Sequence, residues 1–394
     1  MRTLITSSPP IGHVHPVIPL ALSLRDAGHE VLWASGQDAC PMVEMAGIRA
    51  VAAGLSARDR RDEYFRRFPE AHELPPDQRP AHMFPRLFGM VAAPAMLHDL
   101  RPLVDEWRPD IIVHEAGELA APIVAAQLGV PNVCQGYGGL VAPERMSAAS
   151  DAVAPLWHEL GLDPPEWAGA YDHMYLDIYP PSLRPRHGDY IVRRQSMRPI
   201  PFSTPVAPSD PGDVVEVDDR PLVYVTFGTV FNDPEGPFRH AVHGVAELDV
   251  RVVVTVGPEG DPRAFGSLPD NVSVHRYVPQ TELLPRSTLV VSHAGSGTFL
   301  AALGHGLPQL CLPQAADQFL NAQQCDLVGA GLRLAPGEIT RESVRGACAR
   351  LLEEERFRTS ARRIRDELDS MPHPADLVPM IEELAATAGA PLDG

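Results

Sequence analysis

Residues 290–298 read Val-Val-Ser-His-Ala-Gly-Ser-Gly-Thr, an apolar run that passes into a turn of small residues and then into a helical pattern over 299–305. Glycines in such a turn let the backbone approach a ligand, and the unpaired N–H groups and dipole of the helix start favour an anion. His293 and Thr298 add side-chain donors, which suits a diphosphate better than a carboxylate. The segment therefore predicts a strand, a turn and a helix with a diphosphate site between them. The alternative is a tight turn with a satisfied histidine.

Two better-known glycine motifs do not fit this segment. A dinucleotide fingerprint needs a third glycine where Leu300 stands. A nucleophile elbow needs G-x-S-x-G, which does not occur here. An NAD-dependent oxidoreductase and a serine hydrolase are therefore disfavoured.

Apolar strands alternate with amphipathic helices on both sides of this segment. Repeated strand–helix–strand units imply a parallel sheet with helices on both faces, and ligands bind such sheets beyond the carboxyl ends of the strands. The expected strands are 4–5, 30–34, 110–113 and 132–135 in the first half, and 222–226, 251–256, 272–275, 288–292 and 309–312 in the second.

A Pro-, Asp- and Val-rich segment without an apolar period separates the two halves and is typical of a linker. We expect domains at 1–204 and 220–372, joined by a linker at 205–219. Beyond 342 the pattern is almost entirely helical, with breaks at Pro372 and Pro374. Residues 373–394 are therefore expected to form a separate final helix.

Composition narrows the function. The 394 residues suffice for two domains, and 44% hydrophobic with 21% charged residues is typical of a folded globular protein. All 33 basic residues are arginine, which excludes Schiff-base, P-loop and kinase-type lysine chemistry. A net charge of −18 repels phosphate backbones and anionic lipids, so nucleic acid and membrane surfaces are not expected partners.

The cysteines and the apolar runs bear on the compartment. Cys40, Cys134, Cys311, Cys325 and Cys348 are scattered and odd in number, which indicates reduced, mostly buried thiols rather than disulfides or zinc ligands. No apolar run is long enough to span a bilayer, and the first residues lack the apolar core of a signal peptide. A cytoplasmic location is expected.

Two further loops follow predicted strands. Residues 7–16 read Ser-Ser-Pro-Pro-Ile-Gly-His-Val-His-Pro, and Pro16 is expected in the first turn of the next helix. Residues 313–322 contain Asp317 and Gln318, an acceptor and an amide suited to sugar hydroxyls. Asp317 alone has an equally good interpretation as a helix N-cap.

Together, Gly12-His13-x-x-Pro16, His293-Ala-Gly-x-Gly-Thr298 and Asp317-Gln318-x-x-Asn321-Ala322 resemble the motifs of inverting glycosyltransferases with two Rossmann-like domains, the GT-B fold. The resemblance spans essentially the whole chain. It is nearest to bacterial enzymes that glycosylate polyketide, macrolide or enediyne natural products in antibiotic biosynthesis. It implies an α/β fold of two facing doubly wound domains, a cleft between them, and a C-terminal helix that crosses back to the first domain.

The resemblance implies a role for two residues of the first domain. His13 becomes the general base that deprotonates the acceptor hydroxyl, a task that imidazole suits because it titrates near neutrality. Glu115 stands where the family has an Asp that pairs with this histidine. His15 lies two residues from His13, but a third ligand is not evident, so no metal is expected.

The resemblance also implies a donor site in the second domain. The nucleobase stacks on Tyr277 and pairs with the backbone of Val278, while Asp317 and Gln318 bind the donor sugar. Relatives with ribonucleotide donors often carry Glu at the position of Ala301. The absence of this glutamate favours a dTDP-sugar over a UDP-sugar. The residues expected at the diphosphate are His293, Gly295, Ser296, Gly297, Thr298 and Thr229.

Aromatic and Met side chains near Phe84, Phe88 and Met146 are candidates for an acceptor pocket, with ordinary core as the equal alternative. The expected partners are a nucleotide sugar, as co-substrate rather than cofactor, and a small lipophilic acceptor, with a homodimer possible. The expected reaction is transfer of a hexose or deoxyhexose to an aglycone hydroxyl. The alternatives are a UDP-sugar enzyme acting on another aglycone, or an epimerase or auxiliary protein of the same fold.

Overall fold

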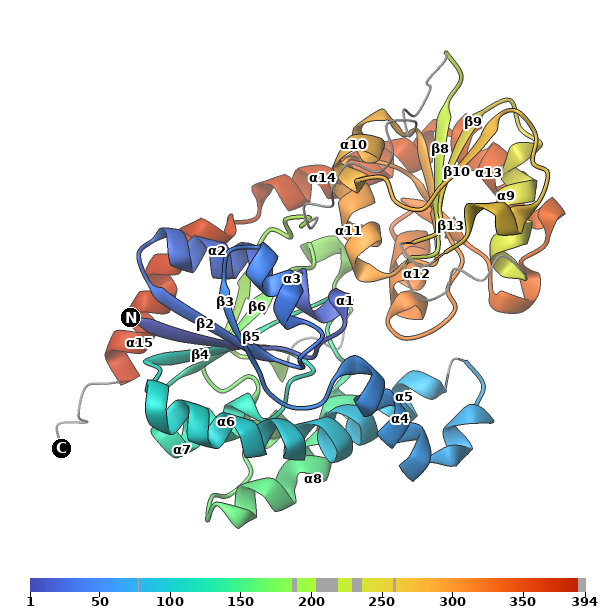
Figure 1. Cartoon of the computed structure of the whole chain (residues 1–394). Coiled ribbons are helices and arrows are strands. Elements are labelled where there is room, and N and C mark those ends of the chain that lie inside the picture. The colour runs from blue at the N-terminus through green and yellow to red at the C-terminus, as the bar shows by residue number, and fades with distance from the viewer. Residues whose placement is uncertain (77, 186–189, 203–218, 229–235, 258–259, 389–394) are drawn as a thin grey trace. The chain divides into compact units, whose positions relative to one another are not determined.

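The computed structural model describes residues 1–76, 78–185, 190–202, 219–228, 236–257 and 260–388 (Figure 1). The chain divides into two compact units. The first comprises Met1–Tyr179, Arg184–Thr204 and Met371–Gly394, and the second comprises Pro180–Leu183 and Pro205–Ser370. Of the predicted linker 205–219, all but Asp219 lies outside the described residues.

The first unit is built on a seven-stranded sheet in which every neighbouring pair is parallel. Strand β1 lies inside the sheet, with Leu4 opposite Leu32 on one side and Ile112 on the other. The strand order is β3 (Arg49–Ala52), β2 (Glu30–Ser35), β1 (Arg2–Thr6), β4 (Ile111–Glu115), β5 (Asn132–Gln135), β6 (Met174–Asp177) and β7 (Arg194–Ser196).

Helices cover both faces of this sheet, because right-handed crossovers to strands on opposite sides of β1 leave on opposite faces. Figure 1 shows α2 (Ile18–Asp26) and α3 (Cys40–Met45) on one face, and α6 (Ala93–Trp107), α7 (Ala121–Leu128) and α8 (Pro143–Glu159) on the other. The other helical segments described below are α1 (Ile11–Val14), α4 (Ala57–Arg67), α5 (Arg79–Met83) and the π-helix η2 (Phe84–Ala92).

The second unit contains a six-stranded parallel sheet. Its order is β10 (Val272–His275), β9 (Arg251–Thr255), β8 (Leu222–Thr226), β11 (Leu289–Ser292), β12 (Gln309–Cys311) and β13 (Gly331–Arg333). In Figure 1, α9 (Pro237–Ala246) and α13 (Arg341–Glu353) cover one face, and α11 (Ser296–Gly304), α12 (Gln318–Leu327) and α14 (Glu355–Ser370) the other. The short α10 (Gln280–Leu283) precedes β11.

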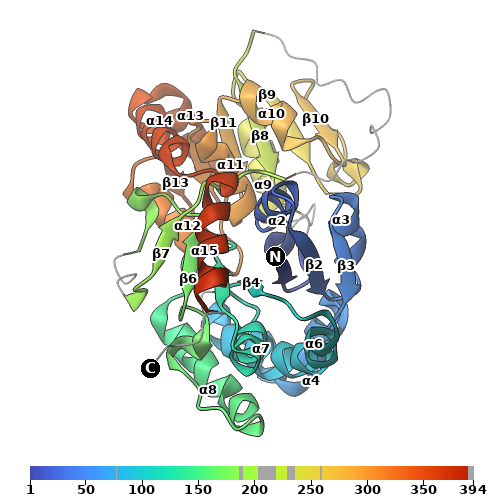
Figure 2. The same ribbon diagram turned by 90° about the vertical axis from the view of Figure 1, so that its left-hand side faces the viewer.

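The last helix, α15 (Val378–Ala388), belongs to the first unit. The Nε2 atom of His29, just beyond α2, lies 2.9 Å from Glu382 Oε1, and the amide of Arg198 donates to the Pro372 carbonyl at 2.8 Å. Figure 2 shows α15 lying against the first unit. The chain thus returns to the first unit after completing the second, as the resemblance implied.

The predicted alternation of strands and helices is confirmed, with a doubly wound parallel sheet in each half. Strands β3, β6, β7 and β13 were not predicted, and the short α1 was also missed. Pro16 does not lie in the first turn of α2, which instead carries Pro19. Pro16 lies in the turn after α1, so the prediction that it begins the next helix was wrong. No helix in the described part of the chain combines the length and apolar character needed to cross a membrane.

Candidate active site

His13 lies on α1, just beyond the carboxyl end of β1, and faces the end of β4. Its Nδ1 atom is 3.2 Å from Glu115 Oε1, with His13 15% exposed and Glu115 fully buried. The Nδ1–H bond does not point squarely at this oxygen, so the contact is a close polar contact rather than a well-aligned hydrogen bond. The structure thus brings together the two residues that the resemblance pairs, and it leaves Nε2 as the nitrogen that can take a proton.

Two backbone amides hold the Glu115 carboxylate in place. Ser8 N donates to Oε1 at 3.0 Å, and Gly117 N donates to Oε2. Burial alone would raise the pKa of Glu115, but the charge and contact of His13, with the two amide hydrogen bonds, bring the pKa below its usual value. Glu115 therefore stays ionised, and the longer side chain reaches His13 from the strand end.

Aromatic rings surround His13. Its ring centroid is 4.2 Å from that of Tyr137 and 5.5 Å from that of Phe88, both in tilted arrangements. Gly117 makes room for this packing, because a Cβ there would come within 2.9 Å of Phe88 Cε1 and 3.1 Å of Glu115 Oε2. The imidazole is therefore held by a carboxylate on one side and by rings on others.

The three acceptor candidates lie in the core of the first unit. Phe84 is 6% exposed, Phe88 8% and Met146 0%. All three belong to one cluster of buried residues, which is the core alternative stated above. Phe88 differs from the other two because it also contacts His13.

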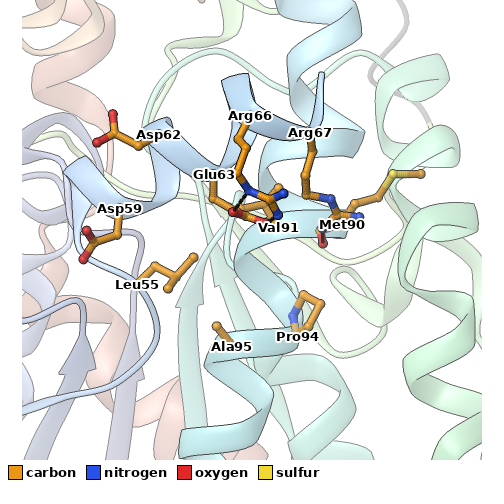
Figure 3. Close-up of a pocket in the computed structure, with 10 residues that line it drawn as sticks. All are labelled: Leu55, Asp59, Asp62, Glu63, Arg66, Arg67, Met90, Val91, Pro94 and Ala95. Atoms are coloured by element: carbon orange, nitrogen blue, oxygen red, sulfur yellow. Dashed lines mark hydrogen bonds and ion pairs between the residues drawn. The ribbon is translucent and has the colours of Figure 1, made fainter. Parts of the chain in front are cut away.

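A hollow of about 550 Å³ lies between α4, η2 and the start of α6 (Figure 3). Charged side chains of α4 form one side of it, including Glu63, whose carboxylate pairs with Arg66. Met90, Val91, Pro94 and Ala95 form the apolar side. Met90 is 39% exposed, so this part of the Met- and Phe-rich segment does reach the surface.

Sequence reasoning missed Arg60 on α4. This arginine is 6% exposed, and its guanidinium carbon lies 5.2 Å from the centroid of the Phe88 ring. Helix α4 reads Ala-Arg-Asp-Arg-Arg-Asp-Glu-Tyr-Phe-Arg-Arg, so nothing in its composition separates Arg60 from its exposed neighbours. The one available signal was the spacing to Tyr64, the other buried residue of the helix, because positions four apart share a face.

In the second unit, His293 follows β11 and two glycines accommodate its ring. A Cβ on Gly295 would come within 2.6 Å of His293 Nε2, and one on Gly228 within 2.9 Å of Cε1. Gly228 also has φ +70°, a conformation that favours glycine. Burial lowers the pKa of His293 to about 4, against the opposite effects of Asp317 and the Thr226 backbone. His293 is therefore neutral near pH 7 and supplies at most one N–H donor to a ligand.

Helix α11 starts three residues after this histidine, at Ser296, which is three residues earlier than predicted. Its first intrahelical hydrogen bond runs from Phe299 N to Gly295 O, and no side chain caps the start. The amides of Ser296, Gly297 and Thr298 precede that bond and are available for an anion. Thr229, the remaining diphosphate candidate, lies outside the described residues.

The Thr298 hydroxyl is oriented by a neighbouring amide. Gln280 Nε2 donates to Thr298 Oγ1 at 2.9 Å. Because the oxygen acts as acceptor in this contact, its own hydrogen remains available for a ligand.

Asp317 accepts a short hydrogen bond from the Ser296 hydroxyl, and the buried Asn321 side chain donates to Asp317 Oδ2 at 3.3 Å and to Ala294 O at 2.8 Å. Asp317 occupies the N-cap position of α12 as the cap interpretation expected, but its side chain makes no capping hydrogen bond. Gln318 Oε1 accepts from the amides of 314 and 315 and thereby braces its own loop.

The nucleobase candidates follow β10. Tyr277 is partly exposed, whereas Val278 is 6% exposed and packs in a small core cluster that also contains Ala301. Their part in base binding stays a prediction.

No cluster of three or more His, Cys, Asp or Glu side chains that could hold a metal occurs among the described residues. Burial lowers the pKa of His15 to about 4, and its ring meets the edge of Phe202.

Two family models match the chain. The C-terminal domain model described as "Erythromycin biosynthesis protein CIII-like" covers residues 239–384, and the corresponding N-terminal domain model covers residues 22–210. Together they account for most of the chain. Both units described above are therefore those of one family.

Individual relatives agree with these models. The chain is 35% identical to L-demethylnoviosyl transferase of Streptomyces niveus, over 95% of this chain and 96% of that protein. It is 33% identical to the elloramycin glycosyltransferase ElmGT of Streptomyces olivaceus, over 96% of each.

Solved structures give the same result. The glycosyltransferase VinC in complex with dTDP superposes with a TM-score of 0.81 at 27% identity, covering 98% of this chain and 100% of that one. The spinosyn rhamnosyltransferase SpnG complexed with spinosyn aglycone gives 0.80 at 26%, covering 97% and 100%. The chain belongs to the erythromycin biosynthesis protein CIII-like family and is a glycosyltransferase of the GT-B fold.

Proposed function

We propose that this enzyme transfers a hexose or deoxyhexose from a dTDP-sugar to a hydroxyl of a lipophilic natural-product aglycone, with inversion at the anomeric carbon and without a metal. The observation that carries the proposal is the contact between His13 and the buried, ionised Glu115. A carboxylate at Nδ1 fixes the imidazole tautomer and stabilises the imidazolium that forms when Nε2 takes a proton.

The acceptor half of the reaction follows from this pair. Nε2 of His13 removes the proton of the acceptor hydroxyl while the oxygen attacks the anomeric carbon. The new C–O bond forms on the face opposite the leaving diphosphate, and the bond from the anomeric carbon to the diphosphate breaks with its electron pair. Attack from that side inverts the anomeric configuration.

The donor half rests on the start of α11. The leaving dTDP gains negative charge, which the first amides of the helix, the Thr298 hydroxyl and the helix dipole stabilise. His293 is neutral and adds no charge to this site. Asp317 is held by Ser296 and Asn321 with its carboxylate near the same loop, which suits a sugar hydroxyl donor.

The ligands named with related structures support this donor. VinC was solved with dTDP and SpnG with thymidine diphosphate. They favour dTDP over the UDP-sugar alternative, and transfer over an epimerase or auxiliary role. All five cysteines are free, which is compatible with the cytoplasmic location that forms part of this proposal. A homodimer stays a prediction that light scattering would test.

Replacing His13 tests the mechanism. The His13→Ala enzyme should lose at least about 100-fold in kcat, the usual contribution of a general base, while its Kd for dTDP stays that of the wild type. His98→Ala, a change on the exposed side of α6, serves as the matched control. Product is measured by mass spectrometry with a dTDP-sugar and a panel of hydroxylated polycyclic and macrolide aglycones. Undiminished turnover by His13→Ala would refute the mechanism.

Calorimetric titration with dTDP and UDP tests the donor. The expected result is tighter binding of dTDP. A clear preference for UDP would replace the proposed donor with the alternative one and leave the transfer chemistry unchanged.

A further inference from the structure

Arg60 is a buried cation of the first unit, and the reaction above does not use it. With Tyr64 it forms the inward face of α4. Its Nε and Nη1 atoms are buried and have no hydrogen-bond partner among the described residues. Burial lowers the pKa of Arg60, and the opposite effects of Glu115, Tyr137 and Asp38 are smaller. The interactions of the buried guanidinium with its neighbours therefore do not offset the free energy lost when it was removed from water.

The position of Arg60 relates it to the His13–Glu115 pair. The Phe88 ring lies under the guanidinium at 5.2 Å and beside the His13 ring at 5.5 Å. The charge of Glu115, a neighbour of His13, also acts on Arg60. Arg60 is thus next to the place where the acceptor hydroxyl must meet His13.

Arg60 also lines a cavity of about 20 Å³, enough for roughly one water-sized group. Leu55, Met96 and Leu119 form apolar parts of its wall, and Ser8, Phe88 and Gly117 connect it to the loops that hold Glu115. A buried donor fork beside a space of this size suits a single oxygen of a ligand whose remaining surface is apolar.

Glu118 also lines this cavity but does not neutralise Arg60. Its carboxylate accepts hydrogen bonds from the Thr6 hydroxyl and from the amides of Ala120 and Ala121. Burial raises the pKa of Glu118 to about 7, so a large fraction of it is protonated near neutrality. Glu118 therefore adds less than a full opposing charge beside the cation of Arg60, and the ionised Glu115, held by His13 and two backbone amides, is the opposing charge that acts on Arg60.

We propose that Arg60 determines acceptor specificity by binding an acidic oxygen of the aglycone, a carboxylate, phenolate or enolate, close to the hydroxyl that His13 deprotonates. The inference rests on the proposed function, because it gives that function's acceptor a chemical class. Guanidinium forms forked, charge-assisted hydrogen bonds to such oxygens, and these satisfy N–H groups that are otherwise orphaned.

Two matched probes test the inference. 3-Hydroxy-2-naphthoate carries a carboxylate beside its hydroxyl, and 2-naphthol lacks the carboxylate. Naphthol fluorescence titrations should show the wild type binding the acid at least tenfold tighter than 2-naphthol. Arg60→Met should lose that preference by tenfold or more, with unchanged affinity for 2-naphthol and for dTDP. Arg61→Met, an exposed neighbour on the same helix, should behave as the wild type.

Thermal unfolding of the same variants separates recognition from a structural role. Burial of this charge costs more free energy than its interactions with neighbouring groups return. The Tm of Arg60→Met should therefore not be lower than that of the wild type. A lower Tm together with equal loss of both probes would assign Arg60 a structural role and overturn the inference. The inference would also be overturned if the wild type bound the acid no more tightly than 2-naphthol. Water molecules, rather than a ligand oxygen, would then accept the hydrogen bonds of the Arg60 N–H groups.

The outcomes also separate this inference from the proposed function. Transfer from a dTDP-sugar to both naphthols at equal kcat/KM would leave the function standing and remove the role of Arg60. Arg60-dependent binding of the acid without any sugar transfer to it would contradict the proposed function and leave the binding site standing.

Discussion

Each unit of the molecule places a histidine and a carboxylate near the carboxyl ends of parallel strands, but the two pairs are built differently. In the first unit, Glu115 lies 3.2 Å from His13, is fully buried and is ionised. In the second unit, Asp317 is bonded to Ser296 and Asn321, and burial keeps His293 neutral. The first pair can accept and hold a proton, whereas the second presents a neutral histidine and an acceptor carboxylate of fixed position. The difference shows that the neighbours of a histidine, more than its motif, determine its chemistry.

The strongest test of this difference removes the charge at Glu115. We expect Glu115→Gln to lower kcat by about 100-fold or more, because the amide can neither fix the His13 tautomer nor stabilise its imidazolium. The Kd for dTDP should not change. Steady-state kinetics and calorimetry measure both quantities, and Glu30→Gln at the exposed start of β2 is the control. If Glu115→Gln kept the kcat of the wild type, the charge of Glu115 would not matter for the reaction, and the proposed difference between the His13–Glu115 and His293–Asp317 pairs would be contradicted.

A second test concerns the other buried carboxylate of the first unit, Glu118. Its pKa in the folded chain is about 7 against an ordinary value of 4.5, so the stability it contributes is full below pH 4.5 and is lost as the pH rises through 7. Relative to Glu118→Gln, the free energy of unfolding of the wild type should fall by about 3 kcal/mol over this interval. Urea denaturation at several pH values measures it. Parallel curves for the two proteins would contradict the burial effect, and Glu106→Gln on the exposed side of α6 should show such curves.

The smallest expected effect tests the fixed position of His293. An alanine Cβ at 295 would lie 2.6 Å from His293 Nε2, so Gly295→Ala must displace the ring. Overpacking of this kind costs about 1–3 kcal/mol, and we expect roughly tenfold weaker dTDP binding. Gly304→Ala, in the same helix and with no atom within 4 Å of its Cβ, should bind dTDP normally. Equal Kd values for the two variants would show that the position of His293 does not matter for the donor.

The sequence predicted the sheets well where strands are apolar and central. Strands β8 and β11 are fully buried and apolar apart from their last residues, Thr226 and Ser292, as a parallel sheet covered on both faces requires. Strands β7 (Arg-Gln-Ser) and β13 (Gly-Leu-Arg) lie at sheet edges, are three residues long and have no apolar run. The hydrophobicity pattern of the sequence therefore does not predict them.

Prediction of the site was limited in a similar way. The pairing of His13 with Glu115 came from the family resemblance, and the two side chains do lie in contact, because β1, which precedes His13, is the parallel neighbour of β4, which ends at Glu115. Motif spacing could not show that His293 is neutral, because that depends on burial by Phe227 and the glycines around it. Nor could it select Arg60 from an arginine-rich helix, since burial depends on how α4 packs against η2.

The return of α15 to the first unit has a consequence for synthesis. The first unit includes residues from both ends of the chain, with the entire second unit between them. The contact of His29 with Glu382 therefore cannot form until the ribosome has synthesised the chain beyond the second unit. The second unit is continuous apart from a short segment and can fold as it emerges, whereas the first must wait for its last helix. On the ribosome, the unit that starts first is the one completed last.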